Sequence, residues 1–236
     1  MSEKVKKKHK ISPIIIVVIV IAVLGIGYFF LRFRIHSLIV RMTSDSVAVA
    51  PIENENTSNI LIAYFTLGEN SGEDAITSAS VTVVDKVAKG NVRAIADMIQ
   101  ERTKGDLFSV QTAERYAESY NDVVGVAKSE QDNDERPALS NHIKDFDSYD
   151  VIFVGFPTWW SDMPMAMYTF FDEYDFSGKT IVPFNAAMGS EFGVSIESIK
   201  KLEPDATVIE DGYSVYNDKA ENSKDEVSEW LTKLGY

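Results

Sequence analysis

The sequence lacks cysteine altogether and has only three histidines among its 236 residues. Without cysteine, the chain has no disulfide bonds, no thiolate metal site and no cysteine nucleophile. The histidines argue against a histidine metal site, since His9 lies in an N-terminal tail and His36 beside an apolar run. No Ser-His-Asp set stands out around His142, and no carboxylate pair has a spacing that indicates hydrolysis. The composition therefore favours neither metal-dependent nor hydrolytic chemistry.

Charge is divided unevenly along the chain. Residues 1–41 contain eight Lys or Arg residues and one acid, a net charge of +7, whereas the whole chain carries −13. Residues 42–236 therefore carry −20. A body this acidic excludes electrostatic binding to nucleic acid or to an anionic membrane surface, and it should attract basic partners.

Residues 14–31 contain no charged side chain. As an α-helix this run would extend roughly 27 Å, enough to cross the hydrocarbon core of a bilayer. A cleaved signal peptide is the alternative, but its apolar core is normally about 7 to 15 residues long and its cleavage site follows closely. The Ala-x-Ala pattern at residues 48–50 lies far beyond the run. We therefore predict an uncleaved signal anchor, a transmembrane helix over residues 14–31 after a basic tail of residues 1–13.

The flanking charges predict how this helix is oriented. Five lysines precede it within residues 1–13, and Arg32, Arg34 and Arg41 follow it. Because the more basic flank tends to stay in the cytoplasm, we predict a single-pass protein of the cell membrane with a cytoplasmic N-terminus and an extracytoplasmic C-terminal domain. Residues 32–58 are predicted to be a linker that tethers this domain near the bilayer without docking it there, since residues 42–58 lack apolar periodicity.

From residue 59 to residue 236, strand-like and helix-like segments alternate. Apolar runs predict strands at residues 60–65, 107–110, 151–156, 180–184 and 207–209, and apolar periodicity predicts helices at residues 92–102, 120–130, 164–171, 194–202 and 225–234. This alternation is typical of an α/β fold with a doubly wound, five-stranded parallel sheet. The connection between the first strand and the first helix is unusually long.

The third predicted strand ends in a conspicuous loop. Residues 151–156 are apolar apart from Gly155, which predicts a strand that is buried on both faces in the middle of the sheet. Because ligands bind beyond the carboxyl ends of such strands, Pro157, Thr158, Trp159 and Trp160 are predicted to form a binding loop. The alternative is that the two tryptophans pack beneath a helix, since tryptophan is usually mostly buried.

Several stretches together carry a family resemblance. They are residues 60–66, the Gly90-Asn91 pair, residues 157–160, residues 174–180 and the C-terminal residues 230–236. In order and spacing they resemble the flavodoxin-like family of FMN proteins, most closely the short-chain group whose ring loop reads P-x-W-W. The resemblance covers residues 59–236. It implies a sheet of order 2-1-3-4-5 with FMN bound at its carboxyl edge.

On the phosphate side, the resemblance assigns Thr66 to the first hydroxyl position and Gly90 and Asn91 to the end of the phosphate loop. The closing threonine of the family is Val92 here, and residues 67–89 include an insertion. We consider two interpretations of the insertion. It is either a surface excursion or the source of the missing hydroxyl, for which Ser78 is a candidate together with its neighbours Thr77 and Ser80.

On the ring side, the resemblance pairs Thr158, Trp159 and Trp160 with the loop after the fourth strand, at residues 185–193. Indole faces would stack on the flat flavin, and loop amides would bind its polar edge. The candidates in this loop are Asn185, Gly189, Ser190 and Phe192. Relatives often carry a threonine and a histidine where this chain has Ala186 and Ala187, so any protonation by that histidine is absent.

The predicted function is that of a membrane-anchored FMN protein that transfers electrons, with a membrane quinone or another redox protein as its partner. The flavin carries the chemistry, so no catalytic side chain is predicted. If the domain lies in the cytoplasm, an NAD(P)H-dependent FMN quinone reductase becomes the better hypothesis. A third hypothesis is a cofactor-free binding module of the cell envelope, favoured by Val92, Ala186 and Ala187.

Overall fold

The computed structural model describes residues 28, 31, 35, 38–40, 42–44, 46–47, 58–71, 80–117 and 119–236. The predicted basic tail, most of the predicted transmembrane helix and the candidate Ser78 lie outside these residues. Among the residues described, no helix combines the length and the apolar character that a membrane crossing requires.

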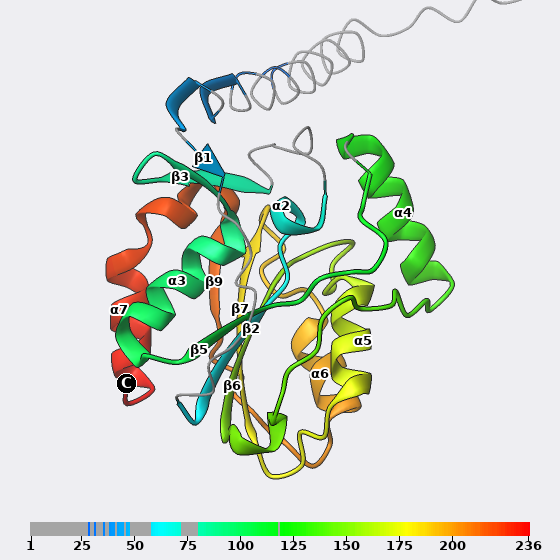
Figure 1. Ribbon diagram of the computed structural model, residues 1–236, viewed down its shortest axis with the longest axis vertical. Coiled ribbons are helices and arrows are strands. Elements are labelled where there is room, and N and C mark those ends of the chain that lie inside the picture. Colours follow the sequence, from blue (N-terminus) through cyan, green and yellow to red (C-terminus); the bar gives the residue numbers. More distant parts are fainter. Residues whose placement is uncertain are drawn as a thin grey trace, which may run out of the picture.

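The main sheet confirms the predicted strand order (Figure 1). Five parallel strands lie in the order β5-β2-β6-β7-β8 and have the bounds β2 (Ile60–Tyr64), β5 (Asp106–Ser109), β6 (Val151–Pro157), β7 (Thr180–Ala187) and β8 (Thr207–Val208). The fifth position is split, because a sixth strand, β9 (Tyr213–Tyr216), pairs with the second half of β7. The sheet thus has six strands in five positions.

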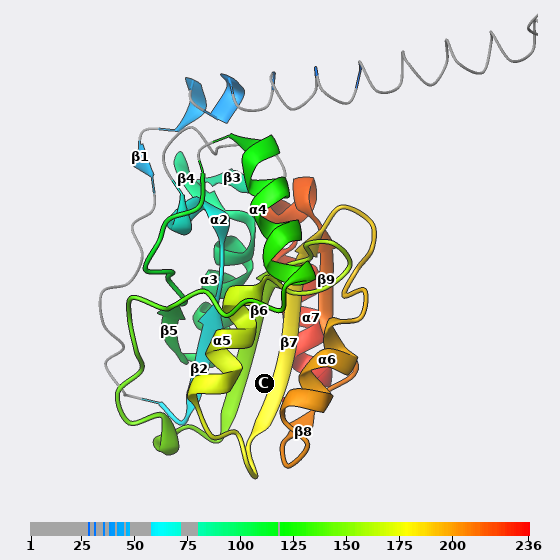
Figure 2. The same ribbon diagram turned by 90° about the vertical axis from the view of Figure 1, so that its right-hand side faces the viewer.

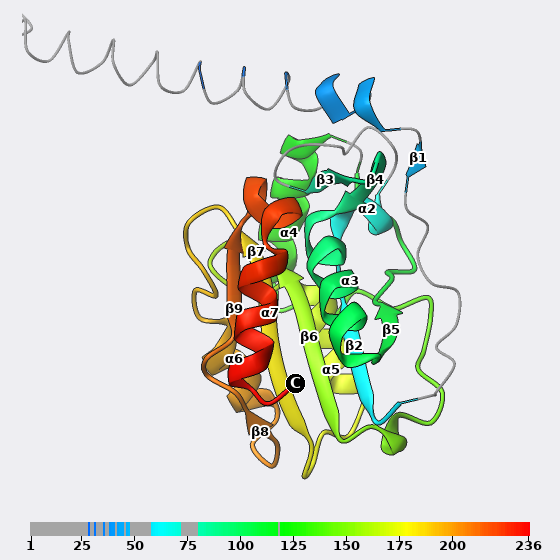
Figure 3. The same ribbon diagram turned by 90° about the vertical axis from the view of Figure 1, so that its left-hand side faces the viewer.

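Helices cover both faces of this sheet (Figures 1 and 3). α3 (Asn91–Thr103) and α7 (Lys224–Lys233) pack on one face, and α4 (Tyr120–Asp132), α5 (Met165–Glu173) and α6 (Ser195–Leu202) lie on the other. Short 3-10 turns occur at Phe146–Ser148 and Asn217–Asn222. β6 is the central strand, and from Ile152 to its end all its residues are buried, because apolar layers cover it on both sides.

The long connection after β2 is more structured than the sequence indicated. It begins with the short helix α2 (Leu67–Asn70) and ends in an antiparallel hairpin of β3 (Val81–Val84) and β4 (Val87–Gly90). The hairpin turns at Asp85 and Lys86, whose φ angles of 49° and 65° match a tight two-residue turn. β4 leads directly into α3.

Part of the predicted linker packs on the domain. Ser46–Val47 forms strand β1, which pairs in parallel with β4 and completes a small three-stranded sheet. Val40 is only 1% exposed and packs with Val81 and Ala88 of the hairpin. The sequence concealed this contact because a two-residue strand leaves no periodic pattern.

Candidate functional site

A pocket of about 280 Å³ lies at the carboxyl edge of the main sheet, beyond the ends of β2, β6 and β7. This edge of a parallel α/β sheet is where ligands are expected. The lining comprises Thr66, Leu67, Ser80, Asn91, Val92, Tyr120, Val123, Val124, Ala127, Pro157, Thr158, Trp159, Trp160, Ala186, Met188, Ser190 and Asn217. It includes eight of the thirteen residues predicted from the sequence.

One end of the pocket is polar and is built around the start of α3. Thr66 is the N-cap of α2, directly after β2, and Gly90 is the N-cap of α3. A Cβ at Gly90 would lie 1.9 Å from Thr66 Oγ1, so only glycine allows the threonine to pack on the backbone here. The first-turn amides of a helix have no acceptor within the helix, and they favour an anion. The amide of Asn91 is engaged by the insertion, so the following amides of the first turn of α3 are the donors that this end can offer to a phosphate group.

The insertion contributes to this end. Ser80 lines the pocket, and its carbonyl accepts a hydrogen bond of 3.0 Å from the amide of Asn91. Val92 also lines the pocket and offers no hydroxyl, as the sequence indicated. Of the three hydroxyl residues considered in the insertion, Ser80 is the one within the described residues. Asn217, which follows β9, completes the polar end and gave no signal in the sequence.

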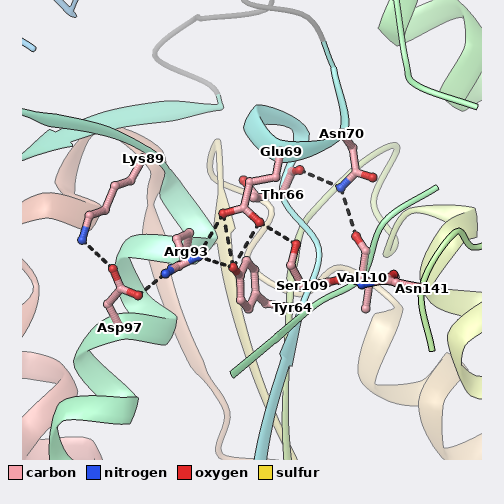
Figure 4. Close-up of polar contacts among 10 residues, drawn as sticks. All are labelled: Tyr64, Thr66, Glu69, Asn70, Lys89, Arg93, Asp97, Ser109, Val110 and Asn141. Atoms are coloured by element: carbon pink, nitrogen blue, oxygen red, sulfur yellow. Dashed lines mark hydrogen bonds and ion pairs between the residues drawn. The ribbon is translucent and has the colours of Figure 1, made fainter. Parts of the chain in front are cut away.

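A buried polar network supports this end from below (Figure 4). Glu69 accepts hydrogen bonds from Tyr64 Oη at 3.1 Å and from Ser109 Oγ at 2.5 Å, and its side chain is 3% exposed. Arg93, in the first turn of α3, lies 3.3 Å from the Glu69 carboxylate and donates to Tyr64 Oη at 2.6 Å. Burial raises the pKa of Glu69, against the hydrogen bond from Ser109 and the charge of Arg93. The network links α2, β2, β5 and α3.

Asn70 fixes α2 from its other side. Its amide donates to the carbonyls of Thr66 and Val110, both at 3.0 Å, and its oxygen accepts from the Thr112 amide at 2.8 Å. Buried polar groups with all their partners in place rigidify a structure. The turn that follows β2 is therefore held firmly on both sides.

The two cations near the polar end do not line the pocket. Lys89 Nζ and Arg93 Nε each lie 2.6 Å from the carboxylate of Asp97 (Figure 4). Within the described lining there is no lysine, arginine, histidine or carboxylate, and Tyr120 is the one titratable side chain. An anion bound here would thus meet amides and hydroxyls rather than cations.

The opposite end of the pocket is apolar and aromatic. Trp159 is partly buried and makes edge contacts with Phe65 and Tyr116, at centroid distances of 5.5 and 5.3 Å. Trp160 is 49% exposed, and its indole Nε1 donates to the Val124 carbonyl at 3.1 Å. The packing of Trp159 combines both sequence interpretations, because it covers part of the core and also lines the pocket. Trp160 lines the pocket without entering the core.

Helix α4 forms one wall of the pocket, which the sequence did not reveal. It supplies Tyr120, Val123, Val124 and Ala127. Apolar residues at helical spacing are normally assigned to the core, and nothing in their pattern distinguishes a face that lines a pocket. Figure 2 shows α4 standing over the carboxyl edge of the sheet.

The loop after β7 reaches the pocket only in part. Ser190 lines it, together with Ala186 and Met188, whereas Gly189 and Phe192 do not. Asn185 is fully buried, and its amide donates to Thr158 Oγ1 at 2.8 Å and to the Glu191 carbonyl at 2.7 Å. Asn185 therefore joins the loops that follow β6 and β7 instead of facing the pocket.

Comparisons with known proteins agree with this fold. The sequence model of the flavodoxin family matches residues 80–234, so the chain belongs to the flavodoxin family. A structure from Bacteroides eggerthii, of a protein classed as a flavoprotein, is 26% identical and has a TM-score of 0.58 over 75% of this chain and 98% of that one. No curated protein matches the chain.

Two further structures share the fold. A protein from Bacteroides uniformis, also classed as a flavoprotein, is 23% identical with a TM-score of 0.56, over 73% of this chain and 97% of that one. A flavoprotein from Lactobacillus acidophilus, solved in complex with FMN, is 18% identical with a TM-score of 0.51, over 72% of this chain and 97% of that one.

Proposed function

We propose that this protein binds FMN in the pocket at the carboxyl edge of its sheet and transfers electrons. The observation that carries the proposal is the division of the pocket into a neutral polar end at the start of α3 and an aromatic end at Trp159 and Trp160. FMN has the matching division, an anionic phosphate and a flat, largely apolar ring. The structural neighbour from Lactobacillus acidophilus was solved with FMN.

The residues present fit this cofactor. Thr66, Ser80 and the first turn of α3 would hold the phosphate, and Trp160 and Trp159 would contact the ring, with Ser190 near its polar edge. When bound, FMN supplies one- and two-electron chemistry at its ring. The described lining offers no acid or base apart from Tyr120. The protein would therefore act by binding, orientation and exclusion of water, while its acidic body would lower the reduction potential.

Titration of the purified protein with FMN and with riboflavin tests the proposal. We expect the yellow colour of bound flavin, quenching of its fluorescence, and tighter binding of FMN than of riboflavin, because only FMN occupies the polar end. A colourless protein that quenches neither flavin would contradict the proposal. It would favour the cofactor-free binding module, for which Val92 and Ala186 in the lining are the supporting observations.

We further propose that residues 14–31 anchor the protein in the membrane with the domain outside the cytoplasm. The support is the charge-free run of residues 14–31 and the five lysines that precede it. Soluble NAD(P)H is not freely available there, so a membrane quinone or a redox protein is the favoured partner. Protease added to intact spheroplasts should remove the domain. A protected domain would make the NAD(P)H-dependent quinone reductase the leading hypothesis.

A further inference from the structure

A tight two-residue turn carries Trp160 to the pocket. The amide of Asp162 donates to the Trp159 carbonyl at 3.0 Å, and the amide of Trp159 donates to the Asp162 carbonyl at 2.7 Å. Between them, Trp160 and Ser161 have φ angles of 51° and 64°. Positive φ at both central residues matches a type I′ turn, which favours asparagine and glycine at these positions. We call residues 159–162 the tryptophan turn.

The residue types of the tryptophan turn do not favour its conformation. Trp160 and Ser161 both carry a Cβ, which makes the left-handed region costly for residues other than glycine, asparagine and aspartate. A backbone of this kind persists only where its surroundings hold it, and such positions cluster at functional sites. The structure around the turn should therefore contain the groups that hold it.

Asp162 ties the tryptophan turn to two helices. Its carboxylate accepts hydrogen bonds from Tyr168 Oη of α5 at 2.7 Å and from Ser198 Oγ of α6 at 3.1 Å. It also accepts from the amide of Met163 at 2.8 Å. Asp162 is buried, and these three donors are neutral. Because burying a carboxylate among neutral partners costs free energy, its presence indicates a role beyond packing.

The loop after β7 holds the tryptophan turn as well. The amide of Val194 donates to the Ser161 carbonyl at 2.8 Å. Gly193 allows this approach, because a Cβ there would lie 2.0 Å from the same carbonyl oxygen. The turn is thus fixed by α5 and α6 and by the loop that contributes Ser190 to the pocket.

The turn sets the position of an indole that has little packing of its own. Trp160 is half exposed and lines the pocket, and its Nε1 donates to the Val124 carbonyl. The direction of such a side chain depends strongly on its backbone. A ring that already occupies its binding position avoids the ordering cost when a flat ligand stacks on it.

We propose that Asp162 is a positioning residue, which holds the tryptophan turn in its left-handed conformation and so keeps Trp160 in place for a flavin ring. The proposal rests on the FMN binding proposed above. Asp162 does not line the pocket, so it acts on the ligand through the turn. Because Trp160 would contact the ring and not the phosphate, loss of its position should affect FMN and riboflavin alike.

Two substitutions of Asp162 test this role. Asp162→Ala should weaken the binding of FMN and of riboflavin equally, by about 5- to 10-fold, the cost of ordering one side chain on binding. Asp162→Asn keeps an oxygen acceptor and should stay within about twofold of the wild type. An equal loss in both variants would mean that the charge matters and not the turn, which would overturn the proposal. Tyr168→Phe removes one donor and keeps the carboxylate, so it replaces Asp162→Ala if that variant does not fold, with a smaller loss expected.

A second substitution separates positioning from a general loss of stability. In the Asp162→Ala protein, Ser161→Gly should restore most of the flavin affinity, because glycine adopts positive φ without a steric cost. Lys104→Gly is the matched control, since Lys104 has a φ of 59° and caps the end of α3 that is remote from the pocket. It should restore no affinity. Restoration by both changes, or by neither, would overturn the proposal.

The flavin-free protein offers a readout that is independent of the cofactor. The chain has three tryptophans, so their indole N–H resonances can be assigned by replacing each in turn with phenylalanine. In Asp162→Ala the Trp160 resonance should move toward that of a free indole, and Ser161→Gly should return it. The Trp230 resonance is the control, because its indole donates to the Asp211 carbonyl and should not move.

The two measurements also separate this proposal from the proposed function. A Trp160 resonance that stays in place in Asp162→Ala would overturn the positioning role, even where flavin affinity falls. A Trp160 resonance that moves as expected, in a protein whose wild type binds no flavin, would contradict the proposed cofactor and leave the positioning of Trp160 by Asp162 intact.

Discussion

The two walls of the pocket are built by different means. The wall formed by the residues after β2 and the start of α3 is polar and rests on the buried network around Glu69. The wall formed by the loops after β6 and β7 and by α4 is apolar, and Trp160 lies in it half exposed. The polar wall rests on a buried network of charged side chains, whereas the apolar wall is joined by neutral hydrogen bonds from Asn185 and Trp160 and presents an exposed aromatic surface.

The difference matches what each end would bind. A phosphate group needs donors at fixed positions, because hydrogen bonds weaken steeply with distance and angle. A flat ring tolerates small shifts, because dispersion and stacking depend weakly on direction. Trp160 and Ser161 have positive φ angles of 51° and 64°, so this loop has an unusual backbone, which the hydrogen bonds of Trp160 to Val124 and of Thr158 to Asn185 hold in place. The predictions below separate the two walls.

The largest effect is expected from Gly90→Ala, which disrupts the packing of the polar wall. The new Cβ would lie 1.9 Å from Thr66 Oγ1, so either Thr66 or the start of α3 must move. We expect FMN affinity to fall about 100-fold, roughly 3 kcal/mol, and riboflavin affinity to fall much less. Titration of both flavins checks this. Gly125→Ala is the matched control, since nothing lies within 4 Å of a Cβ there, and an equal loss in both variants would contradict the assignment.

The next effect concerns the support of the polar wall. Glu69→Ala removes the acceptor shared by Tyr64, Ser109 and Arg93, and it leaves these buried donors short of a partner. We expect the free energy of unfolding to fall by roughly 2–3 kcal/mol, because Arg93 retains Asp97. Urea denaturation of the flavin-free protein measures this loss. Glu69→Gln keeps one oxygen acceptor and should lose less, and an equal loss would mean that shape rather than hydrogen bonding matters at this position.

Loss of Trp160 from the apolar wall should change flavin affinity more than the stability of the fold. Trp160→Ala should weaken the binding of FMN and of riboflavin equally, by about 1–3 kcal/mol, because it removes a stacking surface that both flavins use. Its effect on stability should be small, since the side chain is 49% exposed. Trp159→Ala should also lower stability, because Trp159 packs on Phe65 and Tyr116. If Trp159→Ala alone weakens binding, the ring contacts Trp159.

The same division explains what could be predicted from the sequence. The five main strands and the five main helices follow from local apolar patterns, whereas the strand order followed from the family resemblance. The apolar wall was found through Trp159 and Trp160 because they follow the most apolar strand. The polar network could not be predicted, since Glu69 is 24 residues from Arg93 and 40 from Ser109. Only the fold brings these residues together.

Two further differences have local causes. The hairpin lacked a sequence signal because Asp85 and Lys86 replace the Asn-Gly or Asp-Gly pair that normally marks such a turn. In the sequence, Lys89 and Arg93 lie near enough to the predicted phosphate loop to bind a phosphate. In the structure, both side chains instead form ion pairs with the carboxylate of Asp97. Whether such cations bind a phosphate or pair with a carboxylate depends on side-chain geometry, which the sequence does not show.

The smallest effect is expected at Glu203, which lies far from the pocket beside other carboxylates. Glu203 follows α6 and is half-buried, and its pKa is raised from 4.5 to about 7 by burial and by the charges of Asp175 and Asp172. The native state therefore binds more protons than the unfolded state between pH 4.5 and 7. Stability should fall as the pH rises through this range, and the penalty is fully present above it.

Glu203→Gln should remove this penalty without affecting the pocket. At pH 8 we expect a gain on the order of 1 kcal/mol in the free energy of unfolding, since solvent screens part of the charge of a half-buried group. Below pH 4.5 the variant and the wild type should be equally stable, because the glutamate is protonated in both states. Thermal unfolding from pH 4 to 8 measures this, with Glu229→Gln on the exposed side of α7 as the control. FMN affinity should not change. If it does, the acidic end of the domain is coupled to the pocket and the two walls are not the only determinants of binding.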